Sequence, residues 1–293
     1  TTAEAIIPAS LTNYPTSQSA VDINSVIIAN GGSLMANSTF SGNVTYTRNL
    51  ATTNWYLVSS PVIGQDIDTF ANAEGLASGS NNNMGLGYYN SASATWSYYQ
   101  SDATGSGNFD LGSGRSIKLA SAGDISFTGT MPVDNVSISI TNGFNLVGNP
   151  YPSYIYVVDL LNTNSTNLSE TTIWLWDQAT SSYDAFNLTS TGSYISPAQG
   201  FFVDTSASST LSIAETMQSH QSSDSFQRLS NERPEISLVL SDGENIMDTD
   251  IFYIEGTTTG FDNGYDSTTF GGYFNDFDIY THVKYFVLAT FVI

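Results

Sequence analysis

Hydrophobic and polar residues alternate with a period of two along most of this chain. Clear examples are VSISI at 136–140, ISF at 125–127 and ISLVL at 236–240. A period of two places one face of a strand in the core and the other in water. Turn-forming clusters of Gly, Asn and Ser, such as 80–83 and 105–108, separate these segments. The pattern predicts an all-β protein of short strands, which is typical of sandwiches and barrels.

The middle of the chain contains the same pattern twice. Residues 54–61, NWYLVSSP, correspond to residues 143–150, GFNLVGNP. An aromatic hairpin, a Gly-containing strand and a strand ending in Thr-Met follow in the same order in both copies. These landmarks recur 86 to 89 residues later. We therefore predict an internal duplication of about 87 residues. The expected fold class is a tandem array of β-sandwich units, jelly-roll or immunoglobulin-like.

The duplication divides the chain into four parts. We expect an N-terminal strand segment at 1–39, β-sandwich repeat unit 1 at 40–132, repeat unit 2 at 133–219, and a C-terminal β unit with an apolar terminal strand at 220–293. The polar, aperiodic stretch at 219–225 predicts a linker. A helical turn or two is expected after each repeated Pro, at 67–73 and at 157–161.

Composition restricts the partners. The 293 residues include 27 acidic and 6 basic side chains, a formal net charge of −21. Such a surface repels nucleic acid and anionic lipid, because phosphate binding needs clustered Lys and Arg. No apolar run approaches the ~20 residues that span a bilayer. We expect neither a nucleic-acid partner nor a membrane span. A start without a basic region indicates a mature or trimmed N-terminus.

The Cys and His content of the chain limits the chemistry available for catalysis. The chain has no Cys, which excludes a thiolate nucleophile and a Cys-ligated metal and is compatible with a protein exported from a bacterium. Its two histidines are His220, in the predicted linker, and His282, near the end. A Ser-His-Asp arrangement needs a His held in a formed site, so a linker position argues against one.

Acidic pairs are the other candidate for catalysis. Asp66 and Asp68 are two residues apart, as are Asp248 and Asp250, which on a strand places both members of a pair on one face. Pairs of this kind are expected in so acidic a chain, and a catalytic dyad also needs a pocket. We therefore expect a protein that is not an enzyme.

The sharpest polar motif is DNGYD at 262–266. Carboxylate and amide oxygens in a Gly-containing turn suit Ca²⁺. Asp262 and Asp266 are therefore candidate calcium ligands, and no other cofactor is expected. The same residues also form Asx turns without metal, and the sequence leaves both alternatives open.

The aromatic residues allow two interpretations. Trp96, Tyr98 and Tyr183 are candidates for a glycan-stacking platform, and Trp96 and Tyr183 flank predicted turns. Trp174 and Trp176 could join that platform. Alternatively, they fall on the same side of one predicted strand and pack in a core between sheets, which the matching repeat positions of Tyr89 and Trp176 favour.

The terminal segment 285–293 is apolar on both faces, so as a strand it requires burial on both sides. It is either an inner strand of its own unit or a strand donated to the sheet of another copy. In the second case the donated strand would present Tyr285, Val287, Phe291 and Ile293.

Residues 143–153, GFNLVGNPYPS, resemble the GWNLVGNPYPS signature of secreted Bacteroidota proteins exported by the type IX secretion system. Segments 173–177, 195–203 and 261–266 continue that pattern in order, so the resemblance covers roughly residues 40–283. In that family such β regions usually precede a C-terminal sorting domain in large surface or secreted proteins. The resemblance implies an extracellular or outer-surface location and assigns no catalytic residue. After residue 283 the chain departs from the family pattern into its apolar tail.

These observations predict a non-catalytic extracellular structural or adhesive protein, a cell-surface or filament component that assembles through β-strand or face pairing between copies. The alternative is a carbohydrate-binding accessory region of a secreted polysaccharide-degrading enzyme. The expected partners are further copies or other surface proteins, and glycans under the alternative.

Overall fold

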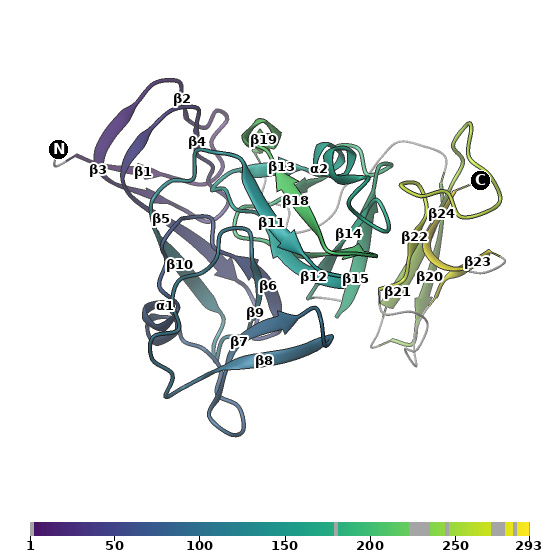
Figure 1. The fold of residues 1–293 in the computed structure, drawn as a ribbon, viewed down its shortest axis with the longest axis horizontal. Coiled ribbons are helices and arrows are strands. Elements are labelled where there is room, and N and C mark those ends of the chain that lie inside the picture. Colours follow the sequence, from purple (N-terminus) through teal and green to yellow (C-terminus); the bar gives the residue numbers. More distant parts are fainter. Residues whose placement is uncertain are drawn as a thin grey trace.

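The computed structural model describes residues 3–178, 181–222, 235–243, 246–270, 279–283 and 286–292. Short strands dominate these residues (Figure 1), and the helical segments are brief. The strands form several mostly antiparallel sheets packed on hydrophobic cores, which confirms the all-β, sandwich-type prediction. Within the described ranges, no helix has the length and hydropathy to cross a membrane.

The first sheet combines the N-terminal segment with repeat unit 1. Its strand order is β1–β3–β5–β10, formed by β1 (Glu4–Ile7), β3 (Val21–Ile28), β5 (Phe40–Leu50) and β10 (Gly123–Gly129). β3 is parallel to both β1 and β5, and β10 is antiparallel to β5. A small parallel pair, β2 (Thr16–Ser17) with β4 (Met35–Ala36), belongs to the same segment. The N-terminal strands thus extend the sheet of unit 1.

Each predicted repeat unit contains a four-stranded antiparallel sheet, and the two strand orders correspond. In unit 1 the order is β6 (Tyr56–Ser59), β9 (Gly114–Ile117), β7 (Asn83–Asn90) and β8 (Thr95–Gln100). In unit 2 it is β12 (Gly143–Gly148), β17 (Gly200–Thr205), β14 (Thr172–Asp177) and β15 (Ser182–Asn187). β11 (Val136–Ile140) pairs with β18 (Ser209–Ile213) as β5 pairs with β10. The duplication itself remains a prediction from the sequence.

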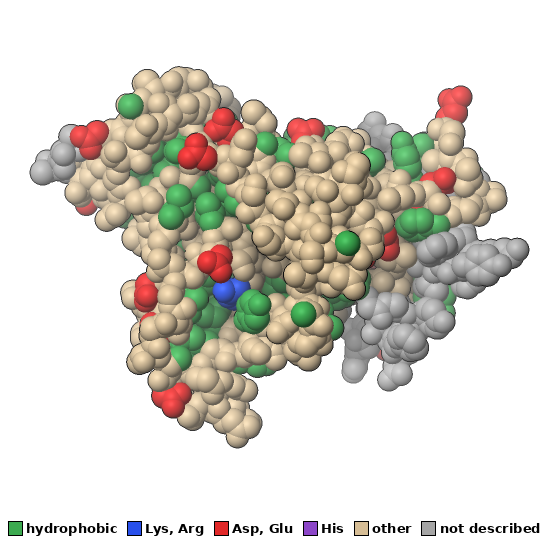
Figure 2. Space-filling view, viewed as in Figure 1, with side chains coloured by type: hydrophobic (Ala, Val, Ile, Leu, Met, Phe, Trp, Pro, Cys, Tyr) green, Lys and Arg blue, Asp and Glu red, His purple; other side chains and the backbone are tan. Residues whose placement is uncertain are grey.

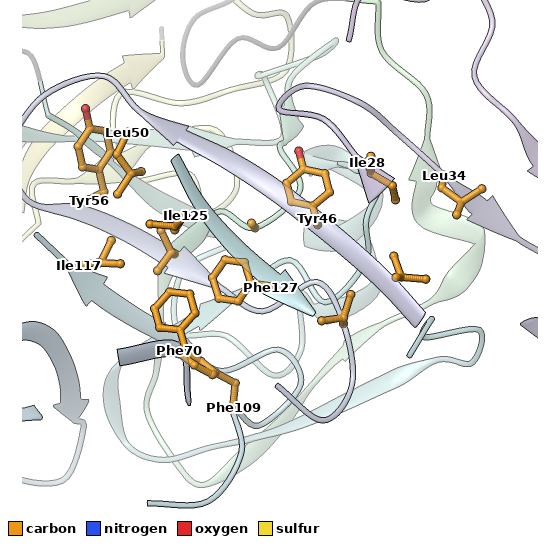
Figure 3. Packing of buried hydrophobic residues seen from close by; sticks show 14 of the residues in the cluster. Ile28, Leu34, Tyr46, Leu50, Tyr56, Phe70, Phe109, Ile117, Ile125 and Phe127 are labelled. Carbon is orange, nitrogen blue, oxygen red and sulfur yellow. The ribbon is translucent and has the colours of Figure 1, made fainter. Parts of the chain in front are cut away.

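A short helix follows the repeated Pro in both units, as predicted: α1 (Ile67–Ala73) and α2 (Val157–Asn164). Asp66 caps α1, because its Oδ1 accepts a hydrogen bond from the amide of Thr69 at 2.7 Å. The helix buries Phe70, whose ring lies 4.9 Å from that of Phe127 and 5.1 Å from that of Phe109. Figure 3 shows these rings together in the core under β5 and β10.

A second core lies within unit 2 and contains fully buried apolar side chains from α2, β14, β17 and β18, among them Leu160, Ile173, Phe201 and Ile213. Burying such a side chain contributes ~1.5–3 kcal/mol relative to exposure. A three-stranded sheet adjoins this core and contains β13 (Tyr154–Tyr156), β16 (Tyr194–Ile195) and β19 (Gln218–Ser219). A 3₁₀ turn at Glu215–Met217 directly precedes β19 in the chain.

The C-terminal unit forms a sheet of its own. Its order is β20 (Glu235–Ser241), β21 (Ile246–Phe252), β24 (Phe286–Val292) and β22 (Ser267–Thr268), and β23 (Thr281–Val283) also pairs with β24. β24 is parallel to β21 and antiparallel to β22 and β23. In this single chain the terminal strand is an inner strand of its own sheet, which is the intramolecular alternative. Donation of the strand to another copy stays a prediction. Val287 and Phe291 lie in β24, whereas Tyr285 and Ile293 lie outside the described residues.

Ser219 and His220, the first two residues of the predicted linker, are held by the rest of the fold. Ser219 belongs to β19 and pairs with Tyr154. The Nδ1 of His220 lies 2.7 Å from the hydroxyl of Ser33, and its Nε2 lies 2.9 Å from that of Thr16. These contacts join positions about two hundred residues apart, which local composition does not reveal. Residues 223–225 fall outside the described ranges.

The two repeat units meet through reciprocal backbone hydrogen bonds. The amide of Ser59 donates to the carbonyl of Ala198 at 3.1 Å. The amide of Gly148 donates to the carbonyl of Gly112 at 2.8 Å. In the predicted alignment Ser59 corresponds to Gly148, and Gly112 to Ala198, so the units exchange equivalent bonds. This reciprocity is the property of an isologous, two-fold interface.

Gly148 is required for this close approach. A Cβ at this position would lie 2.3 Å from the Cβ of Ser59, which real Cβ atoms do not tolerate. We predict that Gly148→Ala lowers the free energy of unfolding by ~1–3 kcal/mol through overpacking. Chemical denaturation followed by tryptophan fluorescence measures this loss. Gly75→Ala is the control, because nothing lies within 4 Å of an added Cβ there. Equal denaturation midpoints for the two variants would contradict the prediction.

Candidate functional site

An aromatic layer joins the four-stranded sheets of the two repeat units. Its buried members are Leu57, Leu146, Trp174 and Phe202, and packed against them are the partly buried Tyr89, Trp96, Phe144, Trp176, Tyr183, Ala185 and Phe270. Trp174 is fully buried, which agrees with its predicted place in a core. The indole N–H of Trp176 donates to the carbonyl of Trp55 at 2.8 Å, so this side chain also fastens unit 2 to unit 1.

Two of the three candidate glycan-binding residues belong to this aromatic layer. The ring of Trp96 lies 5.2 Å from that of Tyr89 and 6.3 Å from that of Phe202. The ring of Tyr183 lies 4.0 Å from that of Phe270, and burial raises the pKa of its hydroxyl. Sugar stacking needs an open ring face, and these rings use theirs largely for protein contacts. Glycan binding by these residues stays a prediction.

Tyr98, the third candidate, lies on β8 with Trp96 and is partly buried. Its ring lies 5.7 Å from that of Trp55. A Cβ added to the cross-strand Gly87 would lie 3.2 Å from the Tyr98 ring and 3.3 Å from the Trp96 ring. The two aromatic side chains thus cover the glycine, a pairing that stabilises a strand where it has no side chain of its own.

The residues that carry the GNPYPS resemblance have structural contacts. Asn149 is fully buried, and its Nδ2 donates to the carbonyl of Ser153 at 2.7 Å and to those of Ile195 and Ser196 at 3.1 Å each. Its Oδ1 accepts from the amide of Tyr151 at 2.9 Å. A buried side-chain amide satisfied in this way fixes two loops against each other, and its loss leaves several buried backbone groups unpaired.

The DNGYD motif docks the C-terminal unit on unit 2. The Oδ1 of Asn263 accepts from the amide of Thr171 at 2.7 Å, and the carbonyl of Gly264 accepts from the amide of Leu188 at 2.9 Å. The Nδ2 of the buried Asn187 donates to the carbonyl of Tyr265 at 2.6 Å. Sequence reasoning missed Asn187, because nothing near it in the chain indicates its distant partner.

The carboxylates of this motif hold the turn itself. The Oδ2 of Asp262 accepts from the amide and the hydroxyl of Thr258, at 2.6 and 3.0 Å. The Oδ2 of the fully buried Asp266 accepts from the amide of Asp262 at 2.7 Å. Gly264 has φ +88°, a conformation that favours glycine. These are the Asx-turn contacts of the metal-free alternative.

No group of three or more His, Asp or Glu side chains that could hold a metal ion occurs among the residues that the structure describes. Calcium binding by Asp262 and Asp266 stays a prediction, and it would need backbone or amide oxygens to complete the coordination.

The acidic pairs also make structural contacts. Asp66 caps α1, while Asp68 accepts from the hydroxyl of Tyr99 at 2.9 Å and from the amide of Ser106 at 3.1 Å. The bonds from Ser106 are the main reason why the pKa of Asp68 is lowered. In the second pair, Asp250 accepts from the hydroxyl of Ser237 at 2.6 Å. Burial lowers the pKa of His220.

The edge strand β20 interrupts the polar surface with consecutive exposed apolar side chains. Acidic groups are scattered over the face in Figure 2 among mainly uncharged polar side chains and backbone. β20 instead exposes a run of apolar side chains: Ile236 by 46%, Leu238 by 40%, Val239 by 63% and Leu240 by 36%. The sequence predicts a half-buried strand here, which is wrong for these four side chains. The signal was Val239, which interrupts the alternation and makes both faces apolar.

Glu170 offers a pH test of the docking contact. Burial raises its pKa, although its carboxylate accepts from the amide and hydroxyl of Thr268, at 3.1 and 2.6 Å. With a raised folded-state pKa, the stability that this group contributes is present at acidic pH and is lost as the pH rises through that pKa. We predict that Glu170→Gln, which keeps the shape, gains thermal stability over the wild type as the pH rises from about 4 to 7. Melting curves measure this gap. The exposed Glu255→Gln is the control, and a gap that does not change with pH would refute the prediction.

One comparison with known proteins found a match, to a family model. No curated protein and no solved structure matches the chain. A family model described as a domain of unknown function, DUF8693, matches residues 13–288. Because this match covers nearly all of the 293 residues, the chain belongs to the DUF8693 family.

Proposed function

We propose that this chain is a non-catalytic structural or adhesive component of an extracellular or outer-surface assembly, which forms through β-strand or face pairing between copies. The observation that carries the proposal is the exposed apolar strand β20 at the edge of the C-terminal sheet. An apolar sheet edge is a site at which another strand adds.

The contacts of the candidate catalytic residues support a structural role. Asp66 and Asp68 hold a helix and a loop, and both ring nitrogens of His220 lie within hydrogen-bond distance of hydroxyl groups. The repeated units are joined by a buried aromatic layer and by reciprocal backbone bonds, which suits a stiff spacer better than a cleft that opens and closes.

The outer-surface location rests on the composition and on the resemblance to type IX secretion cargo. A net charge of −21 and the absence of Cys suit an exported bacterial protein. Uncharged polar side chains supply much of the remaining solubility, since only 11% of residues are charged.

We predict that the purified chain forms assemblies larger than one copy as its concentration rises, because the apolar edge gains burial only between molecules. Light scattering and negative-stain imaging over a range of concentrations measure this. A chain that stays monomeric throughout, and that binds a glycan array in a manner abolished by Trp96→Ala, would favour the carbohydrate-binding alternative instead.

A further inference from the structure

We infer that β20 pairs with β20 of a second copy of this chain, in antiparallel orientation about a two-fold axis at Leu238. This inference rests on the proposed function and adds the strand, the partner and the geometry. An isologous contact of this kind closes on itself, so it makes a dimer; any longer assembly would use a second surface.

The position of β20 in its sheet permits the pairing. β20 is the end strand of the order β20–β21–β24–β22, with β21 as its neighbour through the register Glu235↔Phe252 to Ser241↔Ile246. Among the described residues, no strand pairs with the opposite edge of β20. A copy of β20 placed there would continue the sheet and satisfy the backbone groups along this edge.

The uncharged side chains of β20 suit a second copy as the partner. From Ile236 to Ser241 the strand has no charged residue, in a chain with a net charge of −21. Most surfaces of two such molecules repel each other, and this strand is a place where two copies meet without bringing like charges face to face.

Pairing over all seven residues of β20 defines the register. With Leu238 on the axis, all residues from Glu235 to Ser241 are paired, Ile236 lies opposite Leu240 of the second copy, and Leu238 lies opposite its own equivalent. Cross-strand apolar pairs stabilise a sheet, and this arrangement makes one apolar row that crosses the dimer. Glu235 then lies opposite Ser241, so the two acidic residues do not oppose each other.

Single-cysteine variants of the full chain test this register, since the protein contains no Cys. Only a residue on the two-fold axis faces its own equivalent, so Leu238→Cys is expected to form a disulfide-linked dimer under mild oxidation. Ser237→Cys and the distant, exposed Ser80→Cys are expected to stay largely monomeric. Efficient cross-linking of Ser80→Cys, or none at Leu238→Cys, overturns the proposed geometry.

A charge substitution tests the surface independently of the register. Leu238→Lys places a charge at the centre of the pairing edge and is expected to abolish the dimer of twice 31.4 kDa in size-exclusion chromatography with light scattering. Ile27→Lys is the matched control, because Ile27 is 45% exposed on a different sheet. The wild-type dimer is also expected to strengthen with added salt, which screens the repulsion between two acidic molecules.

The outcomes separate this inference from the proposed function. Assemblies that persist in Leu238→Lys, with circular dichroism and melting unchanged, show that another surface pairs the copies, which overturns the inference and leaves the proposed function standing. A wild-type chain that is monomeric at all concentrations and salt levels overturns both.

Discussion

Two four-stranded sheets, one from each predicted repeat unit, pack against one shared aromatic layer. Trp174 and Phe202 are withdrawn from water between the units, and an aromatic side chain buries ~150–250 Å². Because neither sheet buries this face alone, separating the units would expose these aromatic side chains to water. The reciprocal bonds at Ser59 and Gly148 then fix the distance at which the sheets meet. The N-terminal strands and the C-terminal sheet attach to a body that this contact holds together.

Polar side chains link loops and the C-terminal unit to the two packed sheets. Asn149 joins two loops at the repeated Pro, and the DNGYD turn joins the C-terminal unit to unit 2 through Asn263 and Asn187. Side-chain amides suit this task, because one group donates and accepts at once and bonds backbone from distant segments. The chain has no Cys, so no disulfide takes part in these links. A motif whose sequence suggests a metal site can therefore serve to join two parts of the fold.

The acidic surface and the apolar edge strand β20 have opposite effects on the approach of a second copy. A net charge of −21 favours repulsion between molecules, and from Ile236 to Ser241 the edge strand β20 carries no charge that would add to it. Natural sheets usually protect such an edge with charges, Pro or a covering segment. From Ile236 to Ser241, β20 has neither a charged residue nor Pro, which is why we propose it as a contact between copies.

Local periodicity encodes much of the secondary structure of this protein. The strand at Val136–Ile140, both short helices and the core position of Trp174 follow from alternation, from the residues after a repeated Pro and from aromatic spacing. Only the tertiary structure decided which segments meet. It placed His220 beside Thr16, Trp96 against Phe202, and β24 between strands of its own chain. Such contacts join residues far apart in the chain, and their energy depends on burial and geometry that no local pattern contains.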